Sequence, residues 1–151
     1  MERTFRHSAG FGKRIEFWLI GKMMKEGLDV YVPLVDDFGI DAVIRKSNGE
    51  FVELQIKASS MSVKFGAAAL FAAITHEPRR NYFFLFYSER MNLMWLLSSE
   101  DFIKESTQNK NGKNFGKRSI WFNGKKTKNY SEHCKVQYEK YLISDFSFLK
   151  S

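Results

Sequence analysis

Four polar side chains within two apolar segments have the types expected of a hydrolytic metal site. Asp41 lies inside the run Gly39–Ile44, and Glu53, Gln55 and Lys57 alternate with apolar residues in a second run. Because successive side chains of a strand point to opposite faces, Glu53, Gln55 and Lys57 share one face. A carboxylate, an amide oxygen and an ammonium gathered on one sheet could hold a divalent metal beside a water molecule.

The two runs predict a β-hairpin. They flank Arg45–Glu50, which contains the turn signal Asn48-Gly49. An aspartate inside an apolar strand is unfavourable unless its carboxylate is paired or binds a metal, so Asp41 is hard to explain as a structural residue. Taken alone, Lys57 fits a lysine at the exposed end of a strand better than a catalytic residue.

The surrounding segments predict the elements that position these residues. Apolar residues at helical spacing indicate a helix over 11–26, with Gly27 as its C-terminal cap. Residues 29–35 are rich in β-formers, and Pro33 favours an edge strand. An Ala-rich stretch over 66–76 predicts a second helix.

The second half of the chain is expected to be mostly β-structure. Residues 81–87 are apolar on both faces, as in a covered central strand, and 92–97 follow after a tight turn. We further expect a short helix over 98–106, a strand over 119–122 and a C-terminal helix over 131–143. This order predicts an α/β fold, with helices flanking one central mixed sheet, formed as a single domain over residues 1–151.

The motif resembles that of the PD-(D/E)XK nuclease superfamily, which includes restriction enzymes and Holliday junction resolvases. The resemblance covers roughly residues 8 to 60: a helix bearing Glu16, then Gly39-Ile40-Asp41, thirteen residues, and Gln55-Ile56-Lys57. It is closest to a prokaryotic branch whose last motif is Gln-X-Lys. It implies a restriction-endonuclease-like core of αβββαβ order.

The resemblance also implies roles for the site residues. Asp41 would be the principal ligand of Mg²⁺ or Mn²⁺, Gln55 would give its amide oxygen, and Lys57 would orient or activate the attacking water. Glu16 would complete the site, directly or through water. Gln55 is neutral where a carboxylate is usual, and Glu53, Asp36 or Asp37 could supply the missing charge.

The excess positive charge is confined to one stretch. Net charge is +7, yet residues 107–128 carry seven basic side chains and no acidic one, so the remaining 17 basic and 17 acidic residues balance. Such a patch attracts polyanions, and its aromatic residues could stack on bases, although a solvated loop is the plain alternative. The residues expected to contact nucleic-acid phosphates are Lys110, Lys113, Lys117, Arg118, Lys125 and Lys126, with Arg79 and Arg80 as helpers.

The leading hypothesis is therefore a magnesium-dependent endonuclease that cuts DNA with weak sequence specificity or according to DNA structure. Two alternatives stay open: a weakened nuclease-fold module that binds nucleic acid or a protein, and an enzyme acting on RNA. A homodimer is expected if both strands of a duplex are cut. No nucleotide cofactor is expected.

Cellular location is predicted from composition. The single Cys134 cannot form an internal disulfide, and no suitably spaced partner supports a zinc site at His133-Cys134. No apolar run approaches the roughly 18 residues of a membrane span. The N-terminus lacks the apolar stretch of a secretory signal. We therefore expect a soluble cytoplasmic protein.

Overall fold

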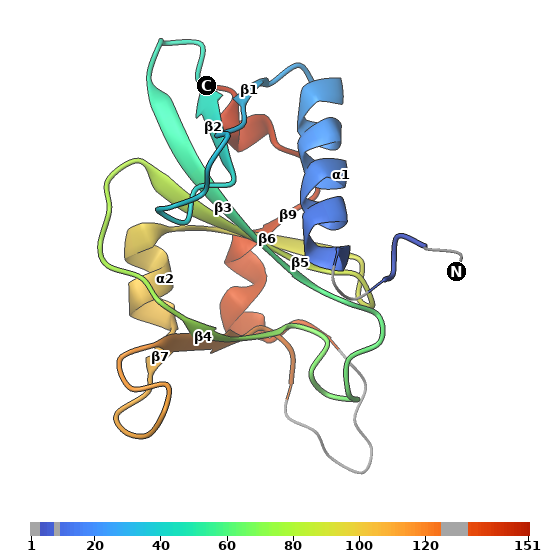
Figure 1. The fold of residues 1–151 in the computed structure, drawn as a ribbon, viewed down its shortest axis with the longest axis vertical. Helices are drawn as coiled ribbons and strands as arrows, with labels where there is room; N and C mark the ends of the chain where they lie inside the picture. The colour runs from blue at the N-terminus through green and yellow to red at the C-terminus, as the bar shows by residue number, and fades with distance from the viewer. Residues whose placement is uncertain (1–3, 8–9, 125–132) are drawn as a thin grey trace.

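A computed structural model describes residues 4–7, 10–124 and 133–151 of the chain. Its main sheet has six strands in the order β1–β2–β3–β5–β6–β9 (Figure 1). Strands β3 and β5 are parallel and the other neighbours antiparallel, which confirms the predicted mixed sheet. The strands are β1 (Asp29–Tyr31), β2 (Ala42–Arg45), β3 (Phe51–Ser59), β5 (Tyr82–Ser88), β6 (Leu93–Ser98) and β9 (Leu142–Ile143).

A smaller sheet and a few helices complete the fold. The smaller sheet has the order β4–β8–β7, with β4 (Leu70–Ile74), β7 (Thr107–Gln108) and β8 (Arg118–Trp121). The α-helices are α1 (Phe11–Lys25) and α2 (Ser99–Glu105), and the 3-10 helices are η1 (Val136–Tyr141) and η2 (Ser147–Leu149). No helix among the described residues is long and apolar enough to cross a membrane.

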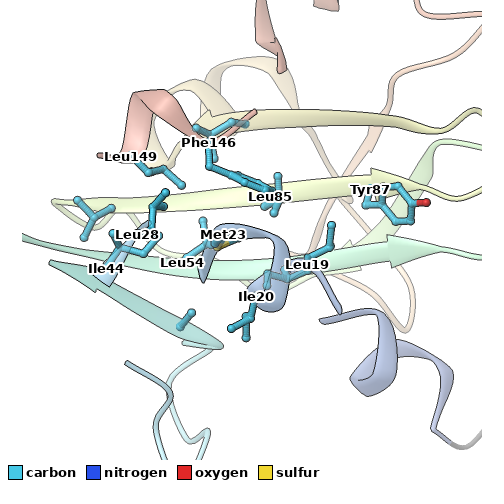
Figure 2. Packing of buried hydrophobic residues seen from close by; sticks show 14 of the residues in the cluster. Leu19, Ile20, Met23, Leu28, Ile44, Leu54, Leu85, Tyr87, Phe146 and Leu149 are labelled. Carbon is cyan, nitrogen blue, oxygen red and sulfur yellow. The ribbon is translucent and has the colours of Figure 1, made fainter. Parts of the chain in front are cut away.

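Helix α1 covers one face of the main sheet. Its buried residues Leu19 and Met23 pack over strands β3 and β5, among Leu54 and Leu85 (Figure 2). Phe146 and Leu149, near the C-terminus, close the same core. The alternation on β3 matches the prediction, because Val52, Leu54 and Ile56 are buried while Glu53, Gln55 and Lys57 are half-buried on the opposite face.

The smaller sheet covers the other face together with α2 and η1. Phe84 and Phe86 of β5 are fully buried there, and Phe86 packs against Phe71 of β4 and Phe122 after β8, with ring centroids 4.8 and 5.2 Å apart. Strand β5 is therefore covered on both faces, as its sequence predicted. Ser98 caps α2 as expected, because its Oγ accepts the Asp101 N–H at 3.1 Å.

The predicted helix over 66–76 is wrong, because this segment contains strand β4. Leu70 and Phe71 pair with β8 residues, and Ala73 has a φ of 58°, which no right-handed helix accommodates. The alanines favour a helix locally. The tertiary burial of Phe71 and Ile74 in the aromatic core outweighs that preference.

Two other predicted elements are shorter than expected. The edge strand over 29–35 reduces to β1 and ends before Pro33, which lacks the N–H that pairing requires. The C-terminal helix over 131–143 begins outside the described residues, and its described part forms η1 and β9. Within this segment Val136 is 81% exposed, whereas Tyr138 and Tyr141 are buried.

Two glycines around α1 give a matched test of the helix and its cap. Gly21 lies within α1, and a methyl group added there would meet no neighbouring atom, so Gly21→Ala should stabilise the protein by about 0.5–1 kcal/mol. Gly27 ends the helix with a φ of +89°, so Gly27→Ala should destabilise it by about 1–2 kcal/mol. Urea unfolding measures both changes. Destabilisation by Gly21→Ala would contradict the helix boundaries.

Candidate active site

Asp41 lies directly before β2, and its side chain accepts a hydrogen bond from β3 where the backbone pairing of β2 has ended. Its N–H donates to the Leu54 carbonyl at 2.8 Å, and its Oδ2 accepts the Ile56 N–H at 2.7 Å. The carboxylate thus satisfies an amide of β3 beyond the end of the β2 ladder. Asp41 is only 7% exposed. Its hydrogen bonds to β3 explain how an aspartate fits within an apolar run.

The environment of Asp41 disfavours its charged form. The pKa of Asp41 is raised to about 6, chiefly by burial and also by the negative charges of Glu16 and Asp36, while the hydrogen bond from the Ile56 N–H opposes the shift. Asp36 is tied to the same loop, since its Oδ1 accepts the Ile40 N–H at 2.9 Å. From the sequence, Asp36 is expected near this site, but the direction of its side chain is open. In the structure its carboxylate interacts with that of Asp41.

Glu16 reaches the same cluster from α1. It is 7% exposed, and its Oε1 lies 3.0 Å from the Lys13 Nζ, one helical turn earlier. The hydrogen bond to Glu16 raises the pKa of Lys13, and the charges of Asp41 and Asp36 add to this shift. Sequence reasoning missed Lys13, although its i,i+3 spacing from Glu16 is a recognisable pairing signal.

Gln55 is held by a tyrosine from the neighbouring strand. The Tyr82 hydroxyl oxygen lies 2.8 Å from the Gln55 Oε1 and 2.5 Å from the Gly39 carbonyl oxygen. Burial raises the pKa of Tyr82, so the phenol stays protonated near neutral pH and can donate. The sequence predicts Tyr82 only as a strand residue, because nothing around it marks a contact with Gln55.

Glu53 and Arg79 bind each other. The Arg79 Nη2 lies 2.5 Å from the Glu53 Oε2, its Nη1 donates to the Phe38 carbonyl at 2.6 Å, and its guanidinium lies 4.5 Å from the Tyr82 ring centroid. The sequence predicts Glu53 as a spare metal ligand and Arg79 as a phosphate contact. In the structure these two side chains support the loop that carries Phe38 and Gly39.

Lys57 shares the strand face of Gln55 and is half-buried. The described part of the chain gives its ammonium no hydrogen bond or ion pair. The structure therefore brings Asp41, Glu16 and Asp36 into one electrostatic cluster and places Gln55 and Lys57 on the adjacent strand.

The predicted phosphate contacts are spread more widely. Lys110, Lys113 and Lys117 lie in the loop between β7 and β8, at the far end of the molecule from the β2–β3 turn (Figure 1). Arg118 is half-buried and donates to the Ile103 carbonyl at 3.2 Å, so it supports α2. Arg80 is exposed. Lys125 and Lys126 lie outside the described residues.

Comparison with known proteins finds a likeness among solved structures. No family profile matches the chain, and neither does any curated protein. Among solved structures, it is similar to the bacterial homing endonuclease I-Ssp6803I, with a TM-score of 0.52 and 22% identity over 74% of this chain and 88% of that one. This likeness shows that the chain shares the fold of that protein. The predicted α/β class with a central mixed sheet is confirmed.

The donor types in the cluster fit a hard divalent cation. Asp41, Glu16 and Asp36 offer carboxylate oxygens and Gln55 an amide oxygen, which are the ligands that Mg²⁺ prefers. Within the described ranges, no three acidic, histidine or cysteine side chains are grouped closely enough to hold a metal. Burial and, to a smaller extent, the charges of Glu16 and Asp36 raise the pKa of Asp41, and a bound dication would oppose that shift.

The raised pKa of Asp41 predicts a stability gain in Asp41→Asn without metal. The pKa of Asp41 is about 6 in the fold against an ordinary 3.8, so its ionisation destabilises the fold as the pH rises through 6. An Asn oxygen still accepts the Ile56 N–H without that charge. At pH 7 in EDTA, urea unfolding should show Asp41→Asn more stable by about 1–3 kcal/mol, since solvent screens part of the repulsion.

The advantage should vanish below about pH 4, where Asp41 is protonated in both folded and unfolded chains. Asp37→Asn is the matched control, because Asp37 is an exposed acid of the same loop. A variant less stable than wild type at pH 7 would contradict the proposed cost of the buried Asp41 charge.

Proposed function

We propose that this protein is a metal-dependent endonuclease of the PD-(D/E)XK type that hydrolyses DNA phosphodiester bonds. The observation that carries the proposal is the buried Asp41 carboxylate at the start of β2, beside the Gln55-X-Lys57 strand and close to Glu16 of α1. The fold shared with a homing endonuclease supports it.

The residues divide the chemistry between them. Asp41, Glu16 and Gln55, with Asp36 as a further donor, would hold Mg²⁺ or Mn²⁺. Such an ion would act as a Lewis acid on the phosphate and favour deprotonation of water. The Lys57 ammonium would position the attacking water and offset negative charge growing on the phosphate oxygens. The Ile56 N–H, which donates to the Asp41 carboxylate at 2.7 Å, would hold that carboxylate in place.

A second candidate function has an observation of its own. Gln55 adds no charge, and Glu53 is engaged by Arg79 and so is not free to compensate. This arrangement would also suit a module that has kept the nuclease fold and binds nucleic acid with little or no cleavage. Metal dependence separates the two functions.

Cleavage of plasmid or branched DNA should require Mg²⁺ and should fall by at least about a hundredfold in Asp41→Ala and in Lys57→Ala. Gel assays of the cut products measure this loss. Asp37→Ala is the control, since it removes an exposed carboxylate from the same loop. DNA binding by the wild type without cleavage in Mg²⁺ or Mn²⁺ would favour the binding module.

The β7–β8 loop gives a separate prediction about affinity. The double variant Lys113→Ala plus Lys117→Ala should weaken DNA binding similarly across DNA sequences. It should also make the slope of log K against log salt concentration shallower by about two units, because binding with two fewer phosphate contacts releases about two fewer counterions. Fluorescence anisotropy at several salt concentrations measures the slope. Lys25→Ala plus Lys150→Ala removes the same charge elsewhere, and an equal slope in both double variants would remove the loop from the interface.

A further inference from the structure

The Tyr82 side chain, beside the candidate site, is held by contacts on several sides. It projects from β5, its ring stacks on His76 with centroids 5.1 Å apart, and the Arg79 guanidinium lies against it. His76 is fixed in turn, because its Nε2 lies 2.7 Å from the Ser99 Oγ. The phenolic oxygen is therefore delivered to a defined point between Gly39 and Gln55.

The hydroxyl has one proton for two neighbouring oxygens. The Gly39 carbonyl oxygen, at 2.5 Å, can only accept, and it is the closer of the two. If the Tyr82 hydroxyl donates its proton to the Gly39 carbonyl, the Gln55 Oε1, 2.8 Å from the phenolic oxygen, faces a second acceptor with no proton between them. A half-rotation of the Gln55 side-chain amide exchanges Oε1 and Nε2, so that an Nε2–H can donate to the phenolic oxygen. The oxygen and nitrogen of a side-chain amide are assigned from such hydrogen-bond networks.

Gly39 leaves room for this arrangement. It has a φ of +67°, and a Cβ at this position would lie 3.3 Å from the Tyr82 hydroxyl oxygen and 3.3 Å from the end of the Gln55 amide that carries Nε2 before the half-rotation. A side chain here would be strained in its backbone and would crowd both groups. The glycine thus lets backbone, phenol and amide approach one another.

We propose that Tyr82 is a positioning residue that fixes the Gln55 amide: its hydroxyl donates to the Gly39 carbonyl and accepts the Gln55 Nε2–H, which keeps the Gln55 carbonyl oxygen as the free end for a cation. The cation part of this inference rests on the proposed function. The hydrogen-bond part does not. A carboxylate at position 55 would have no N–H to offer Tyr82, so the tyrosine also explains why glutamine suits this site.

The hydrogen bond is tested by NMR on the metal-free protein. The side-chain amide signal of Gln55 is assigned by its loss in Gln55→Glu. One of its two protons should be shifted downfield and exchange slowly with solvent, and Tyr82→Phe should abolish both properties. Tyr87→Phe is the matched control, because Tyr87 is a buried tyrosine of the same strand that contacts Trp18 on the opposite face.

The consequence for the cation is tested by calorimetric Mg²⁺ titration. Tyr82→Phe should raise the dissociation constant about fivefold, the effect of losing one ordinary hydrogen bond. In a Gln55→Glu background the same substitution should change it less than about twofold, because both ends of a carboxylate are oxygens and need no orientation. Tyr87→Phe should leave it unchanged in both backgrounds.

The outcomes separate the two proposals. An unchanged Gln55 amide signal in Tyr82→Phe overturns the positioning role, whatever the metal does. An equal loss of Mg²⁺ affinity in the glutamine and glutamate backgrounds overturns it as well. If the wild type binds no Mg²⁺ while the amide signal responds as expected, the positioning role holds and the nuclease proposal fails.

Discussion

The hydrogen bond from the Ile56 N–H to the Asp41 carboxylate is the contact on which the site depends. Strand β2 pairs with β3 only through Ala42–Arg45, so the next amide of β3 needs an acceptor from elsewhere. A side-chain oxygen provides it. The same bond places a carboxylate at the start of β2, on the strand next to Gln55 and Lys57. The Asp41 carboxylate therefore both completes the hydrogen bonding of β3 and is the principal candidate metal ligand.

That placement costs the fold electrostatic free energy. The raised pKa of Asp41 reflects first the cost of burying its carboxylate and then the repulsion from Glu16 and Asp36. Lys13 offsets part of this cost through Glu16. Sites that keep like charges close are poorly suited to stability alone, and they favour binding of a cation that relieves the repulsion. The electrostatics and the donor types thus point to the same kind of ligand.

The sequence was most informative where the determining contacts are local. The 42–59 hairpin has a turn signal and strict alternation, and β5 has an unbroken apolar run, so both could be predicted. Strand β4 could not, because its pairing with β8 spans nearly fifty residues while its alanines favour a helix. The sequence also could not predict two sets of contacts: the hydrogen bonds of Tyr82 with Gly39 and Gln55, and the ion pair of Arg79 with Glu53. They join residues far apart in the chain, and only the parallel pairing of β3 with β5 brings them together.

The neutral Gln55 acquires a physical reason in this setting. Glu16 and Asp36 already raise the pKa of Asp41, and a further carboxylate on the adjacent strand would add to the repulsion in the metal-free protein. Glutamine supplies an oxygen donor without charge, at the expense of weaker attraction for a dication. Glu53, the nearest acid on the same face, is neutralised by Arg79, which also holds the 38–39 backbone. The chain therefore limits the negative charge of the site, and it uses hydrogen bonds from Tyr82 and Arg79 to keep the remaining donors in place.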